Sequence, residues 1–309
     1  MALKIGMHTG QQDCSYEELR RLWRLADSSG FYWVSIWDHH YESPPIDGTH
    51  PAFETVSIMT ALALETTNVR VGCLVFSPAY RNPGMLAKAI TTIDHVSGGR
   101  AEIGLGAGWH EMEYRAFGYE YPRAGIREDM LEETVQIVRS MLHDKTTTFH
   151  GTHYQMENAY NVPKPLQENL RIWVGGGGEK RTIPIAAKYA DAWNGAYFSP
   201  ELYTKKMAIV DAECEKAGRD PAAVGRAVNV GFYMGLNDAD AAAKRERLPW
   251  PADDPRIGGQ LTGTAAEVMD RIGQYADAGA QQLNLAIRAP FEWEALQAFI
   301  EEVMPAFSG

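Results

Sequence analysis

Short apolar runs alternate with longer helical patterns along the whole chain, and this alternation limits the possible folds more than any other feature. Eight runs have the length and composition of strands, at 3–8, 33–37, 69–76, 101–106, 171–176, 191–194, 227–236 and 282–287. Helical patterns follow them, at 15–29, 51–66, 83–96, 126–143, 179–190, 200–217 and 264–278, and a last helix ends near Met304. Eight strands, each followed by a helix, predict an α/β fold of the (β/α)8 barrel (TIM barrel) type.

The main alternative is a doubly wound open sheet with a dinucleotide-binding fingerprint after its first strand. Gly10 stands alone at that place, which disfavours this alternative. Within 146–170, the segment around Gly151 predicts a small hairpin outside the main fold, and 248–262 predicts a surface loop. We expect one domain over residues 1–309, with insertions at the carboxyl face of the barrel.

The charge balance limits the possible partners. The chain of 309 residues has 29 basic and 40 acidic residues, a net charge of −11, which argues against nucleic acid and against a polybasic membrane anchor. No stretch approaches the roughly 18 uninterrupted apolar residues of a membrane span, and we find no secretory signal. The three cysteines form no CxxC pair, which favours a reducing compartment. We therefore expect a cytoplasmic enzyme with a small-molecule substrate.

Functional groups of a barrel lie at the carboxyl ends of its strands. Unusual residues gather there: His8, then Asp38, His39 and His40, then 107–111, 175–178, Asn194 and Arg288. Gly175, Gly176, Gly177 and Gly178 join a strand to a helix expected to begin at Glu179. Four residues without Cβ at a helix N-terminus suit a phosphate, although a flexible turn is the alternative interpretation.

The fourth strand ends in GLGAGW (104–109), whose small residues leave room for a flat ring, or simply allow close packing. His39 ends the second strand beside Asp38 and is the best candidate for proton transfer, whereas His40 should face away. Because His39 and His40 are adjacent and point to opposite faces, we expect no metal site. This combination fits a phosphorylated aromatic cofactor that carries out the main chemistry.

Four segments resemble the luciferase-like monooxygenase superfamily of flavin and deazaflavin barrels, and they cover nearly the whole chain in order. They are 30–40, 69–122, 173–194 and 263–285, with YRNP and GWHEMEYRAFG as the most specific stretches. They are most similar to the subgroup described as probable oxidoreductases that use the deazaflavin coenzyme F420. The resemblance implies an F420-dependent oxidoreductase that transfers a hydride to or from a small organic substrate. An FMN-dependent monooxygenase that uses oxygen is the alternative, because both cofactors have a tricyclic ring and a ribityl phosphate.

The resemblance also implies roles for single residues. A cis peptide at Leu74–Val75 would lie behind the ring, Ala107 and Gly108 along it, and the glycine run near the phosphate. Asp38 and Asn194 complete the expected cofactor site, and substrate would enter near His8 and Trp109. His39 matches a histidine proposed to assist catalysis.

The chain departs from the family pattern at Trp109, where some deazaflavin members have a glutamate that donates a proton. His110, Glu111 or Glu113 would have to replace it, or His39 would act alone. We take Glu113 with His39 as the catalytic candidates. The family tends to form dimers, so a homodimer is expected. Two further possibilities stay open, a flavin-binding protein without turnover and a metal-dependent hydrolase.

Overall fold

The computed structural model describes residues 3–43 and 47–307, in which eight parallel strands close into a barrel. In order around the barrel the strands are β1 (Lys4–Thr9), β2 (Trp33–Ile36), β3 (Arg70–Phe76), β4 (Ala101–Leu105), β7 (Ile172–Gly175), β8 (Ala192–Ala196), β9 (Gly225–Met234) and β11 (Gln282–Ile287). The barrel closes because β1 pairs in parallel with both β2 and β11, and β9 with both β8 and β11. The predicted fold class is confirmed.

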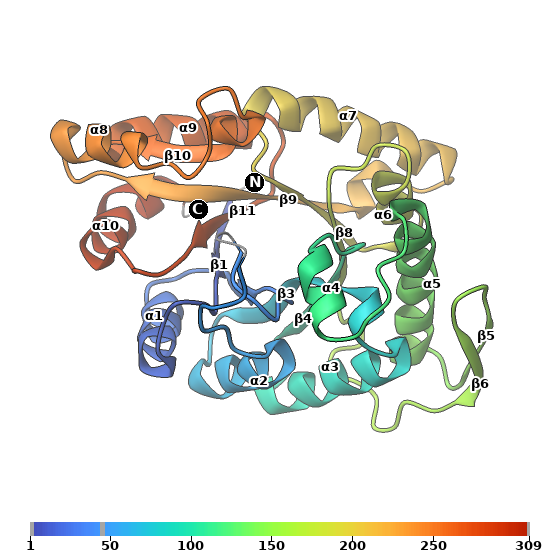
Figure 1. The fold of residues 1–309 in the computed structure, drawn as a ribbon. Coiled ribbons are helices and arrows are strands. Elements are labelled where there is room, and N and C mark those ends of the chain that lie inside the picture. The colour runs from blue at the N-terminus through green and yellow to red at the C-terminus, as the bar shows by residue number, and fades with distance from the viewer. Residues whose placement is uncertain (1–2, 44–46, 308–309) are drawn as a thin grey trace.

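Helices surround this barrel (Figure 1). They are α1 (Tyr16–Ser28), α2 (Thr55–Glu65), α3 (Pro83–Ser97), α5 (Ala124–His143), α6 (Thr182–Tyr189), α7 (Pro200–Lys216), α9 (Ala265–Asp277) and α10 (Trp293–Ala298). Ser15 and Glu18 form the capping box that begins α1. Helix α2 begins four residues later than expected, because the carboxylate of Glu54 caps the N–H groups of Val56 and Ser57.

The barrel interior and its outer surface are packed separately. Inside, side chains from five strands form a cluster of Trp33, Leu74, Trp173, Ala192 and Ala227. The rings of Trp33 and Trp173 meet edge to face, with centroids 5.4 Å apart. A larger cluster fills the space between strands and helices. The filled interior leaves the carboxyl ends of the strands as the place for a site.

The predicted loop at 248–262 is partly wrong, because it ends in a strand, β10 (Gln260–Gly263). Strand β9 pairs with β8 only up to Asn229 and with β11 only up to Gly231, so its last residues extend beyond the pairing with both barrel neighbours. Strand β10 pairs in parallel with Gly231 to Met234 and satisfies the backbone groups there. The pairing is long-range, so the local abundance of proline and glycine concealed it.

Two helices were not predicted, α4 (Glu111–Ala116) at the barrel mouth and α8 (Asp238–Glu246) after β9. The predicted hairpin is confirmed as β5 (Thr147–His150) and β6 (Gln155–Ala159), which are antiparallel and lie on the outside of the molecule (Figure 1). Among the described residues, no helix combines the length and apolar composition that crossing a bilayer requires.

Candidate functional site

A cavity of about 350 Å³ opens at the carboxyl ends of the barrel strands. Most of the residues predicted for the site line it: His8, His39, Leu74, Val75, Ala107, Gly108, Trp109, Gly175, Gly176 and Asn194. Asp38 lines a smaller adjoining recess of about 130 Å³ together with His39. The volume and the mixture of apolar walls and a few polar groups are typical of a small-molecule or cofactor site.

The floor of this cavity is the end of β3. The Leu74–Val75 peptide is cis, as the family resemblance implied, and the β3–β4 register shifts between Cys73 and Phe76. The side chain of Val75 is pressed against glycines of the neighbouring strands. A Cβ at Gly106 would lie 2.3 Å from Val75 Cγ2, and one at Gly175 would lie 2.6 Å from Val75 Cγ1. The glycines are therefore required for this floor to form.

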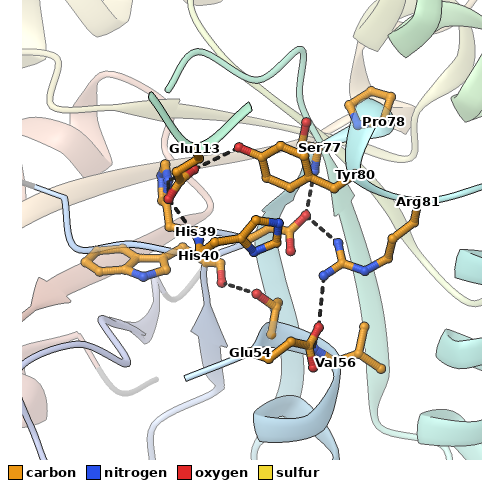
Figure 2. A network of polar contacts seen from close by, with 12 residues as sticks. His39, His40, Glu54, Val56, Ser77, Pro78, Tyr80, Arg81 and Glu113 are labelled. Carbon is orange, nitrogen blue, oxygen red and sulfur yellow. Dashed lines mark hydrogen bonds and ion pairs between the residues drawn. The ribbon is translucent and has the colours of Figure 1, made fainter. Parts of the chain in front are cut away.

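His39 is held by a buried carboxylate, that of Glu113 at the start of α4 (Figure 2). Its Nδ1 lies 3.0 Å from one oxygen of Glu113, whose side chain is fully buried. The same carboxylate accepts hydrogen bonds from the backbone N–H groups of His40 and Tyr41 and from the Tyr80 hydroxyl. Burial alone would raise the pKa of Glu113, but these bonds and that from His39 lower it to about 2.

Because Glu113 is ionised, the tautomer of His39 that carries hydrogen on Nδ1 is favoured. Its Nε2 is then the nitrogen available for proton transfer in the cavity. Glu113 has donors on both oxygens already and does not line the cavity. The geometry therefore suits Glu113 for positioning His39.

A second carboxylate network lies directly beside the first (Figure 2). Asp38, almost fully buried, accepts from the Ser77 backbone N–H at 2.9 Å and from Arg81 Nη1 at 2.6 Å. Arg81 also donates to Glu54 at 3.0 Å. The other oxygen of Asp38 is buried without a partner among the described residues. Charge in this part of the rim is thus almost completely paired.

His8 lies at the end of β1, the strand beside β2, and also lines the cavity. Its Nδ1 lies 3.0 Å from the Ser35 hydroxyl. Burial, with the nearby charges of Arg288 and His39, lowers the pKa of His8 to about 3. His8 is therefore a neutral hydrogen-bonding group at physiological pH and not a source of charge.

The remaining two histidines near the site do not line the main cavity. His40 stacks against Tyr80, Phe117 and Tyr119, on the outer side of the rim, as predicted. His110 is buried, and its ring stacks on that of half-exposed Trp109 with centroids 4.9 Å apart. Burial lowers the pKa of His110.

His39, His110 and Glu113 lie close enough to hold a metal ion, with ligand atoms within 4.8 Å of one another. The carboxylate oxygens already accept hydrogen bonds from two backbone N–H groups and from Tyr80. An ion would have to displace these donors, so the arrangement fits hydrogen bonding better than metal binding.

The glycine run differs from its prediction. Helix α6 begins at Thr182 instead of Glu179, and the segment before it is bound by Lys206, which donates to the Gly177 carbonyl at 2.9 Å and to the Glu179 carboxylate at 2.7 Å. Only Gly175 and Gly176 line the cavity, together with Thr182. A Cβ at Gly177 would meet Phe198, and one at Gly178 would meet Thr182. These last two glycines serve close packing.

Several cavity residues were not predicted: Tyr197, Asn229, Thr182 and Ser43. Arg288, which the sequence places at a strand end without indicating a role, also lines the cavity. Tyr197 and Arg288 directly follow β8 and β11, so the strand-end rule could have identified both. Ser43 lies in a loop whose course the sequence does not indicate.

Comparisons with known proteins agree with this geometry. The family model described as luciferase-like monooxygenase matches residues 2–255. An F420-dependent glucose-6-phosphate dehydrogenase of Microbacterium testaceum is 26% identical, over 98% of this chain and 97% of its own. A 5,10-methylenetetrahydromethanopterin reductase of Archaeoglobus fulgidus is 25% identical, over 95% and 96%.

Solved structures share the fold. An F420-dependent secondary alcohol dehydrogenase, in complex with an F420-acetone adduct, superposes with a TM-score of 0.85 at 21% identity, over all of both chains. A monooxygenase from Streptomyces bottropensis superposes with a TM-score of 0.80, also at 21% identity, over 99% of this chain and all of its own. At this level of identity, the likeness concerns the fold alone.

Proposed function

We infer that this chain, which belongs to the luciferase-like monooxygenase family and is an oxidoreductase, uses F420 to transfer a hydride to or from a small organic substrate. The observation that carries the proposal is His39, at the wall of a ring-sized cavity and oriented by a buried, ionised Glu113. Relatives named for F420 dependence align over 98%, 79% and 80% of this chain, which favours F420 over FMN.

The cavity residues fit a flavin-type ring. Asn194 is 3% exposed and its Oδ1 has no partner among the described residues, so it is an acceptor suited to the N–H of a pyrimidine ring edge. Val75 and the glycines beside it offer a flat surface. Gly176 and Thr182 line the cavity where the phosphate would lie, although the Gly176 N–H donates to the Asn194 carbonyl at 3.0 Å and the Thr182 hydroxyl to Glu128 at 2.8 Å, so a phosphate would have to displace these acceptors.

F420, when bound, supplies a ring carbon that accepts or donates a hydride. The residues of the chain do the rest. Nε2 of His39 takes a proton from a substrate hydroxyl during oxidation, or returns one during reduction. Glu113 is a positioning residue that fixes the tautomer and direction of His39. Trp109, 52% exposed, covers the mouth and limits water at the reacting atoms.

Three further expectations belong to this proposal. We propose that residues 1–309 form one domain, that the protein is a homodimer, and that it acts in the cytoplasm. Cys14, Cys73 and Cys214 are buried and free, which is consistent with a reducing compartment. Sedimentation equilibrium tests the dimer directly.

The deciding experiment is equilibrium binding of F420 and FMN, side by side, to the same cofactor-free protein. Tight F420 binding with weak FMN binding is expected. The reverse, together with oxygen consumption on reduction, would replace the proposal with an FMN monooxygenase. Binding of neither cofactor would remove the cofactor interpretation of the cavity.

The role of His39 is tested in the same protein with His39→Ala. Turnover should fall by roughly 10²- to 10⁴-fold, the usual contribution of a general acid or base. Affinity for F420 should change little, because Asn194 and the surface around Val75 would make the other contacts with the ring. Near-normal turnover would exclude His39 from proton transfer.

A further inference from the structure

We propose that the substrate is an organic anion with a flat apolar body, and that its charged group pairs with Arg288 in a second cavity beside the cofactor cavity. The inference rests on the proposed function, because the anion is a substrate only if a hydride carrier occupies the first cavity. The argument uses the shape, charge and position of the second cavity.

The second cavity has a volume of about 310 Å³ and lies at the ends of β9 and β11. Phe232, Trp250 and Pro290 give it apolar walls. Trp250 is held in place on two sides, by the ring of Tyr197 at a centroid distance of 5.6 Å and by Arg256, whose guanidinium lies 5.3 Å from its ring. Planar walls of this kind favour a planar apolar ligand.

The charge of the second cavity is unbalanced. Lys244, Arg247, Arg288 and Glu292 line it. Lys244 is neutralised by ion pairs with Glu292 and with Asp240. Arg247 and Arg288 form no ion pair with any carboxylate in the part of the chain that the structure describes. The cavity therefore has two positive charges available to a ligand.

Arg288 is the cation placed to select a substrate. It is half-buried at the junction of the two cavities and lines both. Its guanidinium lies over the Trp37 ring at 5.0 Å, and its one hydrogen bond within the described residues is a long one, 3.4 Å, to the Tyr197 hydroxyl. A half-buried guanidinium with unused donors is a strong recognition group for a carboxylate or phosphate.

The position of Arg288 also fits the reaction. Arg288 follows β11, the strand paired with the β1 strand of His8, and after burial its charge contributes to the low pKa of that histidine. His8, His39 and Arg288 all line the first cavity. A substrate anchored at Arg288 therefore has its body in the second cavity and its adjoining carbon near His39. Neutral His8 is available as a hydrogen-bonding group beside that carbon.

The test measures binding of three probes of similar shape, benzoate, phenyl phosphate and benzamide, by isothermal titration calorimetry. The protein is used without cofactor and again with saturating F420. The variants are Arg288→Gln, Arg288→Lys and, as a matched control, Arg245→Gln. Arg245 lies on α8 next to Lys244 and pairs with Glu267, so its removal changes the charge without changing the cavity lining.

At least one anion should bind more tightly than benzamide, and Arg288→Gln should weaken that anion by roughly 10- to 100-fold, the usual effect of a charge-assisted hydrogen bond. Arg288→Lys should recover part of the loss, and Arg245→Gln should behave like the wild type. The stronger of the two anions identifies the charged group. Equal binding of benzamide and the anions, or an unchanged affinity in Arg288→Gln, would overturn the inference.

The two proposals fail in distinguishable ways. If F420 does not bind while the anion binds through Arg288, the proposed function fails and the second cavity remains an anion site. If F420 binds and no probe depends on Arg288, the substrate class is wrong and the cofactor assignment stands. Melting curves of each variant show whether it is folded.

Discussion

The two sides of the barrel mouth treat charge in opposite ways. Around β2 to β4, Asp38 and Glu113 are buried with donors on at least one oxygen each, and Arg81 joins two carboxylates. Around β9 to β11, Arg247 and Arg288 face a cavity with no carboxylate paired to either within the described residues. A paired network fixes side chains before any ligand arrives, whereas an unpaired cation is a recognition group for one.

This difference separates two tasks of the site. The β2–β4 side holds His39 in one tautomer and one direction, which proton transfer requires. On the β9–β11 side, Arg247 and Arg288 lack a paired carboxylate among the described residues, which costs a small amount of electrostatic free energy. An anionic ligand removes this cost by pairing with them. Substitutions on the first side should therefore reduce stability, and those on the second should reduce binding while leaving the fold unaffected.

The largest effect is expected for Glu113→Gln. The amide places a donor where four donors converge, from His39, His40, Tyr41 and Tyr80. We expect the free energy of unfolding to fall by about 4 kcal/mol, within the range for breaking a buried charged network. Urea unfolding measures it.

Glu111→Gln is the matched control, on the same helix. Glu111 forms an exposed ion pair with Arg115, so its loss should cost about 0.5 kcal/mol or less. Equal losses of unfolding free energy in the two variants would show that the buried network stabilises the protein no more than an exposed ion pair does.

A smaller loss, about 3 kcal/mol, is expected for Arg81→Gln. It would leave Asp38 buried with only the Ser77 N–H as a donor. Arg81 is partly exposed, so water compensates part of the loss. Arg24→Gln, which breaks a surface pair with Glu65, should change the unfolding free energy by about 0.5 kcal/mol or less. Both variants are measured by urea unfolding. Equal losses of stability in Arg81→Gln and Arg24→Gln would contradict the greater importance of the buried pair.

Next in size is a pH effect at His8, whose surroundings include the unpaired Arg288. Its pKa is about 3 in the folded protein and 6.5 in a free histidine, so between these values only the unfolded state takes up the proton. Stability should therefore decrease as pH falls below 6.5, by about 1.4 kcal/mol per pH unit from this group.

The variant His8→Asn isolates this contribution, because its amide can still reach Ser35. From pH 7 to 5 it should lose about 2 kcal/mol less than the wild type. Protonation of Glu113 does not interfere with this measurement. Its pKa is lowered from 4.5 to about 2, so its contribution to stability is lost only below pH 4.5. Parallel stability curves for the two proteins would show that His8 is not held neutral by its surroundings.

The sequence predicted the barrel and most of the cavity lining for a physical reason. Strand periodicity is local, and carboxyl ends of barrel strands converge whatever the loops do, so His8, His39 and Asn194 could be placed in one site. The family resemblance added the cis peptide at Leu74–Val75, which no local pattern indicates.

What the sequence could not predict depends on distant contacts. Glu113 lies on a six-residue helix and binds backbone groups more than 70 positions away, and nothing in the local pattern shows this. The ion pairs of Arg81 with Asp38 and Glu54 are also non-local. The segment before α6 is bound by Lys206, on the next helix.

The smallest effect is expected on the unpaired side, for the stability of Arg288→Gln. Removal of this guanidinium leaves no buried carboxylate without a partner, in contrast to Arg81→Gln. The change in the free energy of unfolding should be within about 0.5 kcal/mol of zero. A small increase in the free energy of unfolding would agree with the same division of the mouth. The substitution removes both the repulsion between Arg288 and Arg247 and the desolvation of an unpaired cation. Urea unfolding of the cofactor-free protein measures this. A loss of about 3 kcal/mol, equal to that of Arg81→Gln, would mean that Arg288 supports the fold, and the division of the mouth into a structural and a recognition side would be wrong.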